Sequence, residues 1–214
     1  MLKVMAEVKM TWLDYIKGRF HGVVFYNRKG RTYLRKAPGE YKPATVWQKR
    51  QRNRLREVSV FYSIIRQTCL KQIWTKAAEG MSMSGMNLFV KMNIGAFSGI
   101  DQWRDYEKLH FSYGNLPCAD DLEAVCTPDK RKVVFTWDVR LPLREERQSD
   151  KVMAVLVFEN EEFRVFSSAE LPYRRADKRA ELVLEEGSPE PKYVYCFFMT
   201  ENGREFSHDV CCKL

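Results

Sequence analysis

Six cysteines and three histidines are the residues of this sequence best suited to hold a metal ion. The cysteines stand at positions 69, 118, 126, 196, 211 and 212, and the histidines at 21, 110 and 208. The segment closest to a zinc pattern combines His208 with Cys211 and Cys212. Structural zinc sites usually use closely spaced cysteine pairs, and Cys118 and Cys126 are too far apart to supply the second pair. We therefore expect free thiols, and neither a metal nor any other cofactor.

Motifs that carry hydrolytic or nucleotide chemistry do not occur in the sequence. It contains no glycine-rich phosphate loop, no G-x-S-x-G and no H-E-x-x-H, and the histidines fall in three separate segments. His21 precedes a glycine and is predicted to be a turn residue. We expect that the protein is not an enzyme. The alternative is a metal-binding or enzymatic protein that uses His208 and the C-terminal cysteines.

Positive charge is concentrated at the start of the chain. Residues 1–80 hold 18 Lys and Arg against 5 Asp and Glu, whereas residues 81–214 hold 18 against 23. A basic segment joined to a mildly acidic one indicates a polyanionic partner, either nucleic acid or the acidic surface of another protein.

A β-hairpin is predicted to position the first group of cations. The segments 23–26 and 32–35 are rich in β-forming residues and flank a short turn that contains Asn27 and Gly30. The hairpin carries the cations Arg28, Lys29, Arg31 and Arg35 together with the aromatic residues Tyr26 and Tyr33. We expect these side chains to contact a polyanion, with the rings stacking on bases. The alternative is that the cations protect an exposed edge strand from pairing with other chains.

One long amphipathic helix, from about residue 45 to 79, is predicted to position the second group. Its apolar side recurs every three or four residues, at Leu55, Val58, Phe61, Tyr62, Ile65, Cys69 and Ile73. Ahead of that side lie five cations that we expect to bind a polyanion, Lys49, Arg50, Arg52, Arg54 and Arg56, with Trp47 as an aromatic contact beside them. Like charges four residues apart repel, so this turn should face water or an anion. Replacing its four arginines with glutamine is expected to weaken polyanion binding and to leave thermal stability nearly unchanged.

The remainder of the chain predicts a second short helix and then a β-sandwich. The helix spans 84–93, and seven short strands are expected at 122–126, 133–139, 152–158, 163–166, 179–184, 193–200 and 205–210. Trp137 is the expected centre of their core. The predicted fold class is α+β: a basic hairpin-plus-helix module over residues 1–114, and an immunoglobulin-like or fibronectin-III-like β-sandwich over residues 115–214.

We expect neither a transmembrane segment nor a signal peptide in this sequence. Its longest apolar run, Val152–Phe158, is far shorter than the ~20 residues that a membrane span requires. The N-terminal segment has charges where a signal peptide needs an unbroken apolar stretch. We therefore expect a cytoplasmic protein without a membrane partner.

A series of short motifs in fixed order runs through the chain: residues 22–26, 30–38, 43–52, 83–90, 114–117, 135–137, 150–151 and 201–207. In these motifs the sequence resembles a family of Bacteroidota proteins of about this length that is described as a domain of unknown function. The resemblance covers nearly the whole chain. It implies a basic N-terminal module followed by a β-sandwich, and no particular activity, substrate or catalytic residue.

These observations together predict a non-enzymatic binding or assembly protein whose basic N-terminal module docks on a polyanion. A structural component of a virion or mobile element would fit this description, and so would a homo-oligomer.

Overall fold

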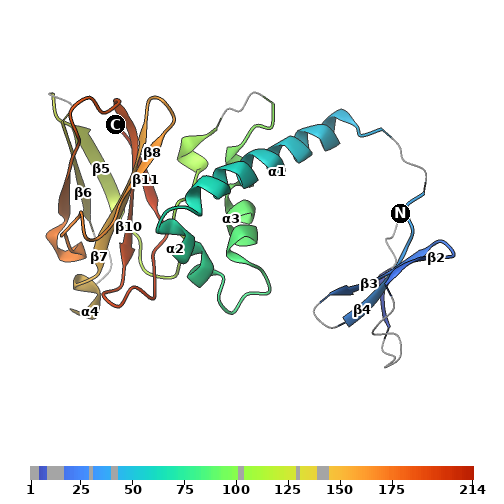
Figure 1. The fold of residues 1–214 in the computed structure, drawn as a ribbon. Helices are drawn as coiled ribbons and strands as arrows, with labels where there is room; N and C mark the ends of the chain where they lie inside the picture. The colour runs from blue at the N-terminus through green and yellow to red at the C-terminus, as the bar shows by residue number, and fades with distance from the viewer. Residues whose placement is uncertain are drawn as a thin grey trace. The chain divides into compact units, whose positions relative to one another are not determined.

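The structure is a computed structural model that describes residues 5–8, 17–28, 31–39, 43–100, 104–128, 131–138 and 145–214. The chain divides into two compact units, Met1–Thr45 and Val46–Leu214 (Figure 1). The division lies between the hairpin and the long helix, not at the predicted boundary between residues 114 and 115. The reason is that the helices bury their apolar side against the C-terminal sheets.

The described residues of the first unit form a four-stranded antiparallel sheet. Its strands are β1 (Met5–Val8), β2 (Gly18–Phe20), β3 (Val23–Arg28) and β4 (Arg31–Lys36), in the order β1-β4-β3-β2. The predicted hairpin is present as β3 and β4. His21 and Gly22 both have positive φ angles, 42° and 78°, and join β2 to β3 in a tight turn. Positive φ at both positions suits a hairpin turn, as the glycine after His21 predicts.

The second unit begins with helices, and the predicted long helix is two helices. These are α1 (Val46–Ile65) and α2 (Leu70–Ala77); α3 (Gly85–Asn93) follows with Ser84 as its N-cap. Between α1 and α2 the Thr68 hydroxyl donates to the Ile65 carbonyl and accepts from the Leu70 amide. A side chain that bonds the backbone in this way competes with helical hydrogen bonds, which explains the break. Cys69 is consequently exposed, outside the apolar side predicted to contain it.

The strands of the second unit form two antiparallel sheets. One has the order β5-β6-β9 and the other the order β11-β10-β7-β8. The bounds are β5 Asp120–Cys126, β6 Lys132–Asp138, β7 Lys151–Phe158, β8 Phe163–Phe166, β9 Arg179–Val183, β10 Pro191–Met199 and β11 Val210–Lys213. The last strand lies beyond its predicted place at 205–210, where Phe206 and Ser207 instead form isolated bridges. A four-residue helix, α4 (Glu145–Gln148), and three 3-10 turns, Ile94–Ala96, Tyr106–Lys108 and Arg175–Asp177, complete the described elements.

Helices and sheets stack in three layers within the second unit. One core joins α1, α2 and α3 to one face of the sheet that contains β7 and β10; the other core lies between that sheet and β5-β6-β9 (Figure 1). Because both faces of β7 are covered, its apolar residues are continuous and do not alternate. Trp137 is buried in the second core, as predicted. The fold is therefore mixed α+β, with a helical layer on the sheets.

Candidate polyanion-binding surface

The register of the hairpin brings most of its predicted site residues to one face of the first sheet. Arg28 pairs with Arg31, Tyr26 with Tyr33, and Val24 with Arg35. Paired residues of antiparallel strands project to the same side, and every second residue shares it. Arg19 of β2, opposite Val24, joins this side. We call the set the arginine–tyrosine face: Arg19, Tyr26, Arg28, Arg31, Tyr33 and Arg35.

The two tyrosines occupy the middle of this face. Their ring centroids are 5.5 Å apart and the ring planes are inclined by 21°, so the rings are stacked. Both side chains are half-buried, while Arg19, Arg28 and Arg31 are exposed. Glu7 of β1 stands opposite Tyr33 in the backbone register. The face thus combines four arginines with a stacked aromatic pair.

Edge protection does not account for all of these cations. β4 is paired with β1 on one side and with β3 on the other between Thr32 and Arg35. Arg35 therefore lies on an interior strand, where no free edge needs protection. Arg28 of β3 lies beyond the end of β2, and Arg31 of β4 lies beyond the end of β1, so neither residue has a described strand beside it on that side. Lys29, also predicted as a site residue, lies outside the described residues.

The cations at the start of α1 divide into two sets, and one of them is structural. The Nε atoms of Arg50 and Arg54 both donate to the Ser98 carbonyl, at 3.1 and 3.2 Å. Gly99 follows with a φ of +72°, and a Cβ there would lie 2.6 Å from the Arg50 carbonyl oxygen. The loop therefore packs against the helix too closely for any other residue. Arg50 and Arg54 hold this loop on α1.

The other set forms an outer stripe. Lys49, Arg52 and Arg56 recur at intervals of three and four residues, are exposed, and make no hydrogen bond or ion pair with any part of the chain that the structure describes. Trp47 is 75% exposed, and the Arg50 guanidinium carbon lies 5.9 Å from the centre of its ring. The stripe and the arginine–tyrosine face belong to different units. Each must therefore be judged as a surface of its own.

Stability should distinguish the two sets of helix cations. The variant Arg50→Gln/Arg54→Gln is expected to lose about 1 kcal/mol of unfolding free energy per arginine, because each charged donor leaves the Ser98 carbonyl. The matched variant Arg52→Gln/Arg56→Gln should stay within about 0.5 kcal/mol of the unaltered protein. Urea denaturation measures both. If both double variants lose the same unfolding free energy, the hydrogen bonds of Arg50 and Arg54 to the Ser98 carbonyl contribute nothing to stability.

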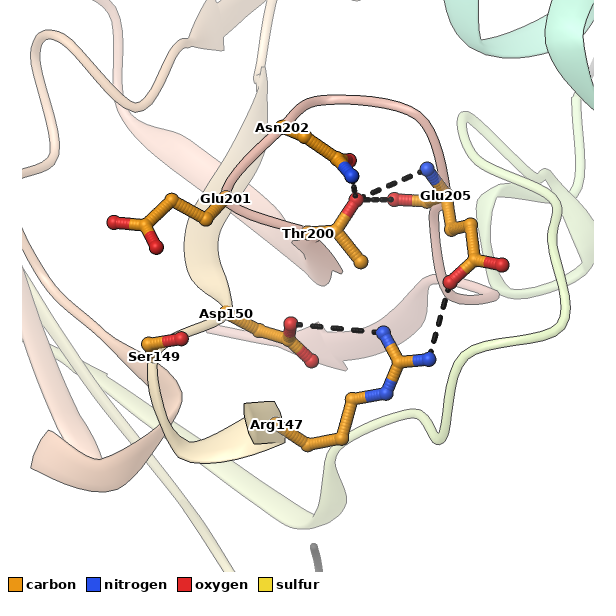
Figure 2. A pocket seen from close by; sticks show the side chains of 7 residues that line it. All are labelled: Arg147, Ser149, Asp150, Thr200, Glu201, Asn202 and Glu205. Atoms are coloured by element: carbon orange, nitrogen blue, oxygen red, sulfur yellow. Dashed lines mark hydrogen bonds and ion pairs between the residues drawn. The ribbon is translucent and has the colours of Figure 1, made fainter. Parts of the chain in front are cut away.

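A pocket that sequence reasoning did not anticipate lies at one end of the second unit. It has a volume of about 570 Å³ and is lined by Arg147, Ser149, Asp150, Thr200, Glu201, Asn202 and Glu205. Figure 2 shows Arg147 between two carboxylates, 4.0 Å from Asp150 and 3.1 Å from Glu205. The Thr200 hydroxyl donates to the Asn202 side chain and accepts from the Glu205 amide. Arg147, Thr200, Asn202 and Glu205 thus pair within the lining, whereas one buried oxygen of Asp150 has no hydrogen-bond partner among the described residues. The lining includes no histidine or cysteine.

Behind the pocket lies a buried ion pair. The Arg175 Nη2 atom is 3.2 Å from Asp150 and 2.8 Å from the Pro117 carbonyl, and the guanidinium carbon lies 3.7 Å from the centre of the Phe198 ring. Arg175 and Asp150 are each about 1% exposed. Burial raises the pKa of Asp150, while Arg175 and Arg147 act in the opposite direction. The pair joins three loops, and we assign it a structural role.

The C-terminal cysteines and His208 are not gathered at one place. Adjacent residues of a strand face opposite sides, so Cys211 packs at the helix-facing core and Cys212 at the core between the sheets. His208 lies against Tyr113, with the ring centroids 4.4 Å apart. Burial raises the pKa of the Cys211 thiol to about 12, which disfavours its nucleophilic form. Within the described residues no group of three or more His, Cys, Asp or Glu side chains is arranged to hold a metal ion.

Hydrogen bonds between His110, Phe111 and Asp209 connect distant segments of the second unit. The Nδ1 atom of His110 is 3.0 Å from one Asp209 oxygen, and the Phe111 amide donates to the other at 2.8 Å. The hydrogen bond with Asp209 raises the pKa of His110 above its usual value, although burial opposes the shift. The sequence does not reveal that His110 pairs with Asp209, because the two residues are 99 positions apart.

The His110–Asp209 pair should make the unfolding free energy depend on pH. A raised pKa means that the folded protein binds the proton more tightly than the unfolded chain. The stabilisation is therefore complete below the unfolded pKa of about 6.5 and disappears as the pH rises through the folded value. The difference in unfolding free energy between the unaltered protein and His110→Gln is expected to shrink on going from about pH 5 to pH 8. A difference that is constant over this range would contradict the ion pair.

Among the described helices none combines the length and the apolar character that a membrane-spanning helix requires. Comparison of the chain with protein-family models, with curated proteins and with solved structures finds no match.

Proposed function

We propose that the protein is a non-enzymatic binding or assembly protein that docks on a polyanion through the arginine–tyrosine face. The observation that carries the proposal is the β3–β4 register, which gathers arginines on one face of a sheet. Residues 1–45 also hold 10 Lys and Arg against 3 Asp and Glu, so the unit has an excess of positive charge. Such an excess raises the local concentration of anions and accelerates their association.

The outer stripe of α1 is the second contact in this proposal. Lys49, Arg52 and Arg56 lie within two turns of a regular helix, which spaces their charges at fixed intervals along its axis. A polyanion that engages both units gains affinity through the chain that joins them, because the second contact becomes intramolecular. An assembly such as a virion or a mobile-element particle would use a protein of this kind.

We also propose that the two sheets of the second unit form an immunoglobulin-like or fibronectin-III-like sandwich. What supports this is the distribution of the strands: the first, second and fifth share one sheet, and the third, sixth and seventh share the other. The fourth lies beside the third. Folds of this kind host many functions, so the assignment adds a scaffold and no chemistry.

The experiment that tests the proposed function measures the affinity of the full chain for heparin, double-stranded DNA and polyglutamate over a range of salt concentrations. For the nucleic acid the logarithm of the binding constant should fall linearly with the logarithm of the salt concentration, because bound cations release counterions. An unrelated protein of the same isoelectric point is the control. Binding no stronger than that of the control to every polyanion would overturn the proposal.

A further inference from the structure

We propose that the arginine–tyrosine face binds single-stranded nucleic acid, with unpaired bases stacking on Tyr26 and Tyr33 and the arginines contacting the phosphates. The inference rests on the proposed function, since it names the chemical class of the polyanion. It is carried by the position of the stacked pair among the arginines of one sheet face.

The tyrosines offer an aromatic surface at the centre of the sheet. They project from β3 and β4, the two middle strands, and their planes differ by only 21°. An unpaired base can extend such a stack, because every base has a π face. Aromatic side chains on sheets are a recurrent platform for single strands.

The arginines lie on both sides of this pair along the strands. Arg28 and Arg31 are each two residues from a tyrosine towards the hairpin turn; Arg35 is two residues from Tyr33 in the other direction, and Arg19 lies opposite its neighbour Val24. A backbone that crosses the tyrosines therefore meets guanidinium groups before and after them. Phosphate contacts of this kind fix the strand without reading its sequence.

The other polyanions use only part of this arrangement. A DNA duplex keeps its bases stacked inside, so it can contact the arginines but leaves the tyrosine rings unused. An acidic protein can pair its carboxylates with the guanidinium groups, but carboxylates do not stack on the tyrosine rings. Single strands are the class whose chemistry uses both.

The test compares a labelled oligothymidine with an abasic strand of the same length, which carries the same phosphates without bases. The full chain is expected to bind the oligothymidine about five- to 150-fold more tightly per stacked base. The variant Tyr26→Leu/Tyr33→Leu should lose this preference and keep its affinity for heparin. The variant Tyr26→Phe/Tyr33→Phe, which retains both rings, should keep the preference.

The outcomes separate the inference from the proposed function. Equal affinity of the unaltered protein for the oligothymidine, the abasic strand and heparin would overturn the inference and leave polyanion binding standing. The comparison uses the unaltered chain, so it decides even if the leucine variant does not fold. If the unaltered protein binds none of the oligothymidine, the abasic strand and heparin in a salt-dependent way, the proposed function is overturned, and the inference with it.

Discussion

Replacing Arg175 with methionine is expected to lower the unfolding free energy of the second unit by about 3–5 kcal/mol, because Asp150 is left buried with only Arg147, 4.0 Å away, as a counter-charge. For a unit of this size the loss corresponds to a fall in melting temperature of about 6–20 °C. Asp150→Asn should act in the same direction, since the Arg175 guanidinium then keeps only the Pro117 carbonyl and the Phe198 ring as partners. Thermal and urea denaturation measure both variants.

A double-mutant cycle identifies the cause of this loss. If the ion pair is responsible, Asp150→Asn/Arg175→Met should be less destabilised than the sum of the two single variants, because no unpaired charge remains in the double variant. Arg174→Gln is the comparison, since the Arg174 side chain is 41% exposed, lies 3.7 Å from Glu201 and donates to the Ser149 carbonyl at 2.9 Å. Its loss should be about 1 kcal/mol. If Arg175→Met and Asp150→Asn each lose no more unfolding free energy than Arg174→Gln, the ion pair contributes little to stability.

Removing three arginines from the arginine–tyrosine face should have the largest effect on binding. The variant Arg28→Gln/Arg31→Gln/Arg35→Gln is expected to reduce the slope of log affinity against log salt concentration by about 2, at about 0.7 for each phosphate contact of a single strand. Affinity at low salt should fall by well over a factor of ten. Fluorescence anisotropy over a salt series gives both quantities.

The control for this variant keeps the same change in net charge. Lys71, Lys91 and Lys213 are exposed residues of the second unit, outside both proposed contact surfaces. Lys71→Gln/Lys91→Gln/Lys213→Gln should leave the salt slope unchanged. Lys36→Gln, which alters the opposite face of β4, is a second control within the same sheet. If the triple lysine variant weakens binding as much as the triple arginine variant, the effect depends on net charge alone.

Local patterns predicted the elements that position these surfaces. β-forming residues on both sides of Asn27 and Gly30 predicted the hairpin, while its register, in which Arg28 pairs with Arg31, comes from the structure. Six of the seven predicted C-terminal strands occur near their expected positions. Apolar residues at intervals of three and four predicted the buried side of α1, where Val58, Phe61, Tyr62 and Ile65 are indeed buried.

Non-local contacts account for what the sequence did not predict. Nothing near Arg50 or Arg54 indicates that a loop 44 to 48 residues later supplies their shared acceptor, so all the helix arginines had the same expected role. Arg175 occurs in a polar segment that is typical of solvated loops, yet it is buried beside Asp150, 25 residues away. The helical layer packs on the sheet that contains β7 and β10, whereas the sequence predicts a module of hairpin and helix. Its apolar side does not indicate whether the hairpin or the C-terminal sheet will cover it.

Photo-cross-linking of the full chain to a single strand that carries halogenated uracil tests the central claim most directly, because it reports which residues touch the bases. Mass spectrometry of the cross-linked peptides should locate the attachment at Tyr26 or Tyr33, and excess heparin should compete for it. Cross-links confined to residues 46–214 would contradict the claim that the arginine–tyrosine face is where the polyanion binds.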